Sequence, residues 1–154
     1  MAPTAKEALQ KLDEFFMRKA LQEAEAAGAA GEIPIGAVVV CQGRIIARAH
    51  NLTETLNDVT AHAEMLAITA AANTLGGKYL TDCTLYVTVE PCVMCAGAIG
   101  WAQLKRIVYG VPDEKRGYQR YAPKAIHPKA NVTIGILEKE CREVMQAFFR
   151  TLRL

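Results

Sequence analysis

Two short segments about thirty residues apart constrain this chain more than any other feature. The first contains His62, Ala63 and Glu64, and the second begins at Pro91 and places Cys92 and Cys95 in a C-x-x-C pattern. Imidazole nitrogen and cysteine sulfur are preferred zinc ligands, and a catalytic zinc has three protein ligands and one position for water. We therefore expect a fold that brings His62 to Cys92 and Cys95, with one Zn²⁺ per subunit.

Glu64 supplies the acid/base group that such a site needs. It follows His62 by two residues at the expected start of a helix, so its carboxylate can reach a water on the metal without ligating the ion. Zinc acidifies its bound water towards neutral pH, and a carboxylate beside that water can accept a proton and return it to a leaving amine. This division of roles favours hydrolytic deamination, with Glu64 as the catalytic residue.

Each half of the pattern has a simpler interpretation when taken alone. A lone C-x-x-C is found in redox and structural sites, a lone His-x-Glu is often the exposed start of a helix, and a structural zinc site would need a fourth ligand. The remaining cysteines fall in or beside expected core elements and are interpreted as small buried hydrophobes, and the remaining histidines as loop residues: Cys41, Cys83, Cys141, His50 and His127. The joint pattern therefore favours catalytic zinc.

Length and composition indicate one ordinary globular domain over residues 1–154. The chain is 51% hydrophobic and 22% charged with a formal net charge of +2, which excludes neither RNA nor small-molecule substrates. The sequence has no apolar run of the roughly twenty residues that a membrane span needs. The five cysteines, an odd number, are unlike the paired framework of a small secreted domain. A cytoplasmic protein that does not enter a membrane is predicted.

Helical and strand patterns alternate along the chain. Helices are predicted over 4–27, 60–73, 92–102 and 138–154, with Thr60 as the N-cap of the second, and strands over 35–41, 45–49, 84–89, 106–110 and 132–136. This order predicts an α/β fold, a three-layer α/β/α sandwich whose five-stranded sheet is mostly parallel and includes one antiparallel hairpin strand. Ligands bind such sheets at the carboxyl ends of strands, where the segments before His62 and Cys92 should meet.

Basic and aromatic residues gather in and before a long irregular stretch, 111–131. Single-stranded RNA loops are held by phosphate contacts and by stacking of bases on aromatic rings, although an ordinary solvated basic surface would have the same composition. The candidates for RNA contact are Lys105, Arg106, Lys115, Arg116, Tyr118, Arg120, Tyr121 and Lys124. On the last helix, one of Phe148 and Phe149 is expected in the core and the other near the substrate.

Several segments together resemble the zinc-dependent nucleobase deaminases, and among these the enzymes that act on adenosine in bacterial tRNA. The segments are 33–37 (IPIGA), 50–51 (HN), 60–64 (TAHAE), 85–99 (LYVTVEPCVMCAGAI) and 148–150 (FFR), so the resemblance covers nearly the whole chain. The H-x-E and P-C-x-x-C signature is how this family is recognised, so it adds no separate support to the zinc argument. Val59 stands where many relatives have Pro, and 117–131 departs from the enterobacterial form.

The resemblance implies a cytidine deaminase-like fold and specific substrate contacts. Asn51 would hydrogen-bond the edge of a flipped purine, Ile35 would pack on its face, and Ala63 would contact it as well. The implied reaction converts adenosine to inosine at the wobble position of a tRNA anticodon, with the anticodon stem-loop as partner. The family works as a homodimer, and the apolar 92–102 helix with Trp101 is the candidate interface.

Two rival functions have different sequence consequences. A deaminase of a free base such as guanine or cytosine would share the same zinc chemistry, so the metal motif does not separate it from an RNA enzyme. A noncatalytic RNA-binding or dimerising subunit would have little use for an acid/base residue. Glu64 therefore argues against the second rival.

Overall fold

The computed structural model of the protein describes residues 2–153. The elements in order are α1 (Ala5–Ala29), β1 (Gly36–Cys41), β2 (Arg44–His50), α2 (Ala63–Leu75), β3 (Cys83–Val89), α3 (Val93–Ala102), β4 (Arg106–Val111), α4 (Tyr118–Tyr121), β5 (Asn131–Ile134) and α5 (Glu138–Leu152). All the predicted helices and strands are therefore present within a few residues of their predicted bounds, except that the predicted end of the last helix at residue 154 lies outside the described residues. The short helix α4 is an addition inside the predicted irregular stretch.

The five strands form one sheet in the order β2-β1-β3-β4-β5. Strand β1 is antiparallel to both of its neighbours, whereas β3, β4 and β5 pair in parallel. The predicted α/β class and the five-stranded sheet are confirmed, but the sheet is parallel only in part. The physical reason is the hairpin turn: Gln42 and Gly43 both have positive φ, 52° and 76°, which reverses the chain tightly and sets β1 inside the sheet, where it has two partners.

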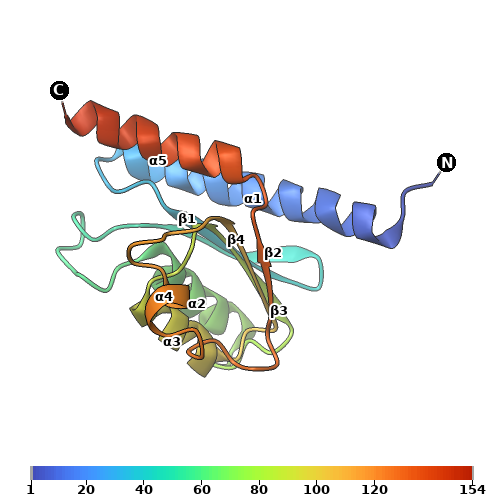
Figure 1. Ribbon diagram of the computed structural model, residues 1–154. Coiled ribbons are helices and arrows are strands. Elements are labelled where there is room, and N and C mark those ends of the chain that lie inside the picture. The colour runs from blue at the N-terminus through green and yellow to red at the C-terminus, as the bar shows by residue number, and fades with distance from the viewer. Residues whose placement is uncertain (1, 154) are drawn as a thin grey trace.

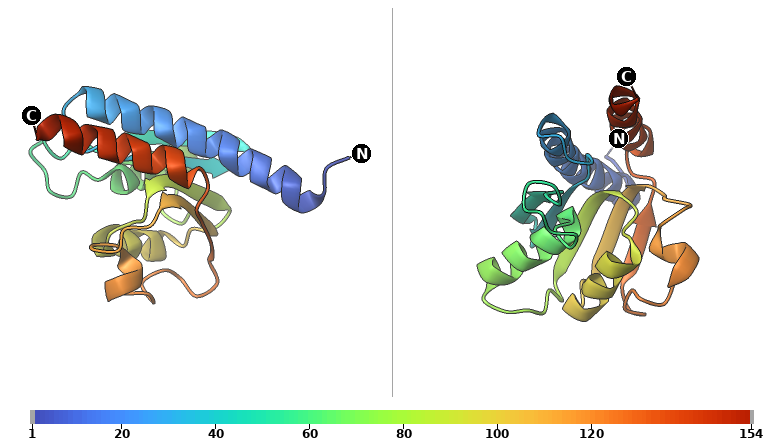
Figure 2. Two further views of the ribbon diagram at one scale, coloured as in Figure 1. Left: turned by 45° about the horizontal axis from the view of Figure 1, so that its top comes forward. Right: turned by 90° about the vertical axis from the view of Figure 1, so that its left-hand side faces the viewer.

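Helices cover both faces of this sheet, as the predicted three-layer sandwich requires. Helices α1 and α5 lie on one face, and α2 and α3 lie on the other (Figures 1 and 2). Small residues let the layers approach closely, because Ala20 and Ala24 of α1 and Ala67 and Ala71 of α2 are fully buried. Each face therefore has its own apolar core, and the loops between the layers meet at the ends of the strands.

Helix α1 is tied to the sheet by a buried polar network. The Asp13 carboxylate accepts two hydrogen bonds from the Arg106 guanidinium, both 2.7 Å, and a third from the Tyr86 hydroxyl at 2.7 Å. Arg106 also donates to Thr133 Oγ1 at 2.9 Å. The prediction that Arg106 belongs to an RNA-binding surface is therefore wrong, because its charge is used inside the fold.

The first turns of α1 extend beyond the rest of the molecule (Figure 1). Leu9, Leu12 and Phe15 are about half exposed there, with exposed fractions of 48%, 54% and 52%. Thr4 begins the helix by accepting a hydrogen bond from the Glu7 N–H. Within residues 2–153, none of the helices combines the length and the apolar character that crossing a bilayer requires.

Candidate metal centre and active site

Two helix starts deliver the predicted metal ligands to one place. His62 is the residue immediately before α2, Cys92 is the residue immediately before α3, and Cys95 lies in the first turn of α3. The predicted N-cap role of Thr60 is wrong, because its N–H and hydroxyl both donate to the Asp58 carboxylate, at 2.8 and 2.7 Å. Neither helix start has a side-chain cap, so their free N–H groups add partial positive charge beside the thiols.

The distances between the ligand atoms fit a zinc ion. His62 Nδ1 lies 3.6 Å from Cys92 Sγ and 3.5 Å from Cys95 Sγ. A tetrahedral zinc at ~2.0 Å from nitrogen and ~2.3 Å from sulfur requires a nitrogen–sulfur separation of about 3.5 Å. The three ligand atoms all lie within 4.8 Å of one another. The donor set and its spacing therefore match zinc.

Three ligands, and not four, make up this cluster. Among residues 2–153, no further His, Cys, Asp or Glu joins His62, Cys92 and Cys95 in holding distance of a metal. His50 ends β2 and pairs with Glu23 of α1 at 2.9 Å, so the expectation that it is a loop residue is wrong. His127 lies in a loop, as predicted, and accepts a hydrogen bond from the Lys129 N–H. A three-ligand set leaves one coordination position for water, as catalytic zinc sites do.

The two thiols are unequal. A hydrogen bond from Cys95, followed by one from His62, outweighs burial and lowers the pKa of Cys92 to about 4. The hydrogen bond to Cys92, together with burial, raises the pKa of Cys95. Hydrogen bonding to Cys92 also raises the pKa of His62. A bound metal cation would favour the thiolate form of both cysteines.

Glu64 lies in the first turn of α2 and is buried, with 4% of its surface exposed. Burial raises the pKa of this carboxyl to about 7. A cation held by His62 and the two cysteines would act in the opposite direction, because positive charge favours the carboxylate. Glu64 is therefore next to the metal ligands in a place where it can exchange protons.

The residues expected at the purine lie at the ends of three elements: Asn51 directly after β2, Ile35 directly before β1, and Ala63 at the start of α2, next to His62. Asn51 is 5% exposed, and its amide donates to the Ile33 carbonyl at 3.3 Å and accepts from the Thr53 N–H at 3.2 Å. The backbone N–H of Asn51 also donates to the Ile35 carbonyl at 3.1 Å. Ile35 is partly buried, and Ala63 is fully buried.

A cavity of about 370 Å³ opens next to His62. It is lined by polar residues of the β2–α2 connection, namely Thr53, Glu54, Asn57 and Asp58, together with Val59 and His62. Val59 is 84% exposed. The backbone of Leu52 donates to the Ala61 carbonyl at 3.0 Å, which draws the two ends of this connection together. Of the three metal ligands, His62 therefore lines a cavity that opens to solvent along this loop.

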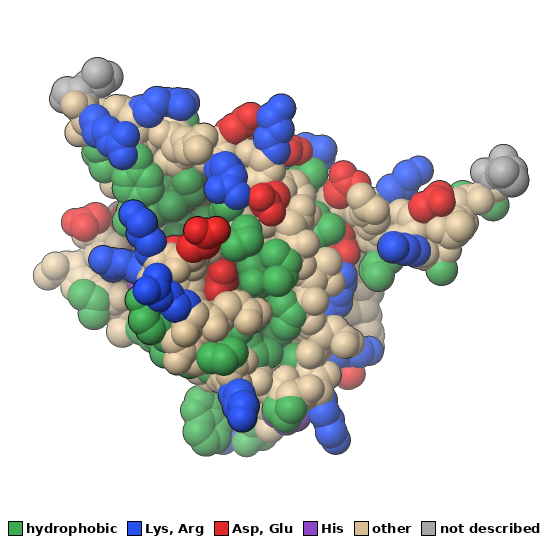
Figure 3. All heavy atoms as spheres, in the orientation of Figure 1, with side chains coloured by type: hydrophobic (Ala, Val, Ile, Leu, Met, Phe, Trp, Pro, Cys, Tyr) green, Lys and Arg blue, Asp and Glu red, His purple; other side chains and the backbone are tan. Residues whose placement is uncertain are grey.

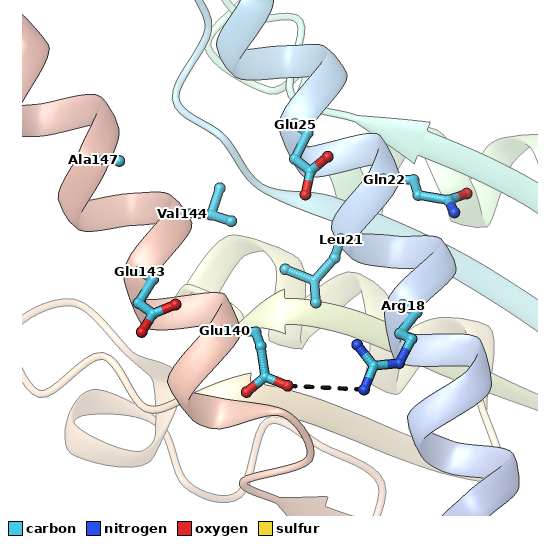
Figure 4. Close-up of a pocket in the computed structure, with 8 residues that line it drawn as sticks. All are labelled: Arg18, Leu21, Gln22, Glu25, Glu140, Glu143, Val144 and Ala147. Carbon is cyan, nitrogen blue, oxygen red and sulfur yellow. Dashed lines mark ion pairs between the residues drawn. The ribbon is translucent and has the colours of Figure 1, made fainter.

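A larger cavity, of about 550 Å³, lies elsewhere. It separates α1 from α5 and is lined by Arg18, Leu21, Gln22, Glu25, Glu140, Glu143, Val144 and Ala147 (Figure 4). Arg18 and Glu140 approach to 4.0 Å across it. Three glutamates and one arginine give this cavity a negative balance, and it lies on the face of the sheet away from α2 and α3. It is not part of the metal centre.

Most of the predicted RNA-contact residues are exposed around α4, whereas the others are buried or lie elsewhere. Lys115, Arg116, Arg120, Tyr121 and Lys124 are exposed, and Figure 3 shows Lys and Arg side chains gathered over α4 and the preceding loop. Tyr118 is 1% exposed, so its predicted surface role is wrong. Lys105 is exposed but precedes β4, at the end of the strand away from the metal ligands. On α5, Phe148 is partly buried and Phe149 is 37% exposed.

Two buried glutamates near the site were not singled out from the sequence. Glu32 accepts hydrogen bonds from the Glu54 and Thr55 N–H groups at 3.0 and 2.7 Å and from the Thr55 hydroxyl at 2.6 Å, which fixes the β2–α2 connection. Glu90 accepts from the Asp113 and Gln119 N–H groups. The one sequence signal for Glu90 was its position between an apolar strand and Pro91, where a solvated charge is not expected.

Comparisons with known proteins agree with this chemistry. Residues 10–111 match the family described as the cytidine and deoxycytidylate deaminase zinc-binding region. The tRNA-specific adenosine deaminase of Bacillus subtilis is 47% identical over 146 residues, which cover 92% of this chain and 91% of that protein. A solved structure from studies of A-to-I editing by tRNA:A34 deaminases at the wobble position of transfer RNA is 45% identical and has a TM-score of 0.80. The match covers 84% of this chain and 98% of the chain in that structure. The guanine deaminase of Nitrosomonas europaea is 26% identical, with a TM-score of 0.79 and coverage of 88% and 83%.

Proposed function

The chain belongs to the cytidine and deoxycytidylate deaminase family, and from that premise we propose that it hydrolyses adenosine to inosine at the wobble position of a tRNA anticodon. The observation that carries this proposal is 47% identity over nearly the full length to a tRNA-specific adenosine deaminase, together with the cluster of metal ligands and the buried Glu64 at the start of α2. The overall reaction consumes water and releases ammonia.

His62, Cys92 and Cys95 would hold one zinc ion per subunit. When bound, zinc acidifies water, so that hydroxide is present near neutral pH. The Glu64 carboxylate accepts the proton that water loses on attacking the purine carbon, and it returns a proton to the departing amine. Glu64 therefore ends each turnover in the state in which it began it.

Asn51, Ile35 and Ala63 are proposed to hold the target base. The Asn51 amide has two N–H donors and two acceptor lone pairs. One donor is used on the Ile33 carbonyl and one lone pair on the Thr53 N–H. One donor and one lone pair remain, and these suit the edge of a purine. The hydrogen bonds to Ile33 and Thr53 also fix the orientation of the Asn51 amide. Its remaining donor and acceptor are therefore already oriented before the base binds.

The exposed basic and aromatic residues around α4 suit the anticodon stem-loop. Arg120 packs over the Tyr121 ring at 5.5 Å, and the Tyr121 hydroxyl donates to the Lys115 carbonyl at 3.0 Å. These contacts give the surface a defined shape next to α3. Phosphates and splayed bases of an RNA loop are bound by this combination of charge and rings. The proposed action on tRNA suits a cytoplasmic protein.

We also propose a homodimer formed through α3. This helix has no charged residue. Trp101 near its end is 84% exposed, and Val93 at its start is 42% exposed. A helix that is apolar all round is normally buried on all sides, whereas α3, which packs on the sheet and contacts α2 and α4, leaves Trp101 and Val93 exposed. A second subunit would cover these two side chains.

The second candidate function is deamination of free guanine, which is favoured by the similarity to two guanine deaminases: that of Nitrosomonas europaea, at 26% identity over 88% of this chain, and that of Bacillus subtilis, at 46% identity over 64% of this chain. Ammonia release should be compared for an anticodon stem-loop with adenosine at the wobble position, the same stem-loop with guanosine there, and free guanine and cytosine. The proposal expects turnover of the first substrate alone. Turnover of a free base alone would replace it with the second candidate, and RNA binding without any product would indicate a noncatalytic subunit.

A further inference from the structure

Glu90 is a buried carboxylate whose two hydrogen-bond partners are backbone N–H groups of one segment, the 113–119 loop, which runs into the start of α4. It lies directly after β3, is 7% exposed, and accepts from the Asp113 N–H through Oε1 and from the Gln119 N–H through Oε2, both at 3.0 Å. Among residues 2–153 it forms no ion pair with Lys, Arg or His. Each of its two oxygens therefore binds one end of the 113–119 loop.

The same loop touches the peptide that carries a metal ligand. Cys92 and Gly117 form an isolated antiparallel bridge, and the Tyr118 N–H donates to the Pro91 carbonyl at 3.0 Å. A Cβ added at Gly117 would overlap the Glu90 carboxylate, so glycine is required for this close approach. The loop, the Glu90 carboxylate and the Cys92 backbone therefore form one packed unit.

Neighbouring side chains respond to the Glu90 charge. Burial, followed by the negative charge of Glu90, raises the pKa of Tyr109. The Tyr109 and Tyr118 rings meet edge to face with centroids 6.4 Å apart under the loop. The loop is thus supported by a charged acceptor and two buried rings, while Lys115 and Arg116 at its tip are exposed.

We propose that Glu90 is a positioning residue for RNA: its carboxylate holds the 113–119 loop against the metal-ligand peptide, so that Lys115, Arg116 and Arg120 meet the phosphates of the substrate at a fixed place. The inference rests on the proposed function for the identity of the substrate. Glu90 does not touch the reacting atoms, and it acts through the loop.

The test compares Glu90→Gln with the wild-type protein on the anticodon stem-loop. A glutamine places an NH₂ group against one of the two N–H donors, so one end of the loop is released. The kcat/KM should fall about 10²-fold, mainly through KM, with zinc content unchanged. The slope of log KM against log salt should become shallower by about 0.7 for each phosphate that the variant no longer neutralises. Glu90→Asp, which keeps both acceptor oxygens, should recover part of the activity.

Two further variants separate positioning from general destabilisation. Gly117→Ala, which pushes the loop off the carboxylate, should reproduce the KM and salt effects. Asp13→Asn removes a buried carboxylate at the opposite end of the sheet and should leave KM unchanged at a temperature where the protein stays folded. An unchanged KM in Glu90→Gln, or an equal rise in Asp13→Asn, would overturn the positioning role.

The outcome for Glu90 can be distinguished from the outcome for the substrate. If the wild-type protein does not deaminate the stem-loop, the proposed function fails. Amide hydrogen exchange at Asp113 and Gln119 then still decides the structural part of the inference. Faster exchange at these two amides in Glu90→Gln supports the role of Glu90 in holding the loop, and wild-type protection overturns it.

Discussion

His62 Nδ1 lies 3.5 Å from Cys95 Sγ, although 33 residues separate them in the chain. The sheet order produces this contact, because β1 and β3 are neighbours and the helices that follow β2 and β3 therefore pack side by side on one face. Because β2 and β3 run in the same direction, both helices begin at the same end of the sheet, where these strands finish. The metal centre is consequently a property of the whole fold, and a metal bound there stabilises the folded state over the unfolded chain.

Replacing Cys95 by Ser should remove zinc and activity together. A serine hydroxyl is neutral near pH 7 and is a poor substitute for a thiolate ligand. Zinc per purified subunit, measured by elemental mass spectrometry, should fall from about one to near zero. Cys41→Ser is the matched control, because Cys41 lies outside the cluster, and it should retain the metal. Full zinc in Cys95→Ser would contradict the ligand assignment.

Glu64→Gln should stop turnover without releasing the metal. The amide has nearly the shape of the carboxylate but does not accept and return a proton, so the rate should fall by at least the 10²- to 10⁴-fold that general acid–base catalysis contributes. Inosine formed in the stem-loop and zinc per subunit are the two measurements. Activity near that of the wild-type protein would refute the mechanism, and loss of zinc would make Glu64 a ligand.

Asp13→Asn should destabilise the fold strongly. The change leaves the Arg106 guanidinium, whose side chain is 16% exposed, without its anionic partner, and breaking a largely buried pair costs about 3 kcal/mol. Tyr86→Phe removes a single hydrogen bond to the same carboxylate and should cost about 1.5 kcal/mol. Urea unfolding measures both values. Equal costs for the two variants would show that the charge on Arg106 is compensated by some other group.

Glu32 should make the stability of the protein depend on acid. The hydrogen bond from the Thr55 side chain, with those from the Glu54 and Thr55 N–H groups, lowers the pKa of Glu32 below its usual 4.5. A carboxyl whose pKa is lower in the folded state stabilises the fold above its unfolded pKa, and this contribution disappears as pH falls through the folded pKa. Glu32→Gln should therefore be less stable than the wild-type protein at pH 7, and the difference should shrink below pH 4.5. Urea midpoints across this range check the sign.

Much of the site could be predicted from the sequence because its chemistry is local. His62 and Glu64 share one helix start, and Cys92 and Cys95 share another, so spacing alone defines each half. The alternation of strands and helices was enough to predict that the halves meet. The cap of α2 was predicted wrongly because Thr60 has a nearer partner in Asp58, and single-residue propensities do not include that competition.

The buried charges could not be predicted because their partners are distant in the chain. Asp13 and Arg106 are 93 residues apart, and both are of charged residue types that usually lie on the surface. Tyr118 was expected on the RNA surface, yet it packs against Tyr109 under the loop. Only the three-dimensional packing decides whether a tyrosine in a basic loop faces solvent or core. Glu90 belongs to the same class, since its loop partners follow it by 23 and 29 residues.

Trp101→Glu should convert a dimer into a monomer. Wild-type protein at micromolar concentration should have twice the 16.8 kDa mass of the chain in light scattering, because α3 exposes Trp101 and Val93 on an uncharged helix. A glutamate there would have to lose its hydration in an apolar interface, which is costly without a partner charge. Leu12→Glu, at a half-exposed residue of α1 in the other helical layer, is the control and should remain dimeric. A monomeric wild-type mass would refute the α3 interface, and dissociation of Leu12→Glu alone would move the interface to α1.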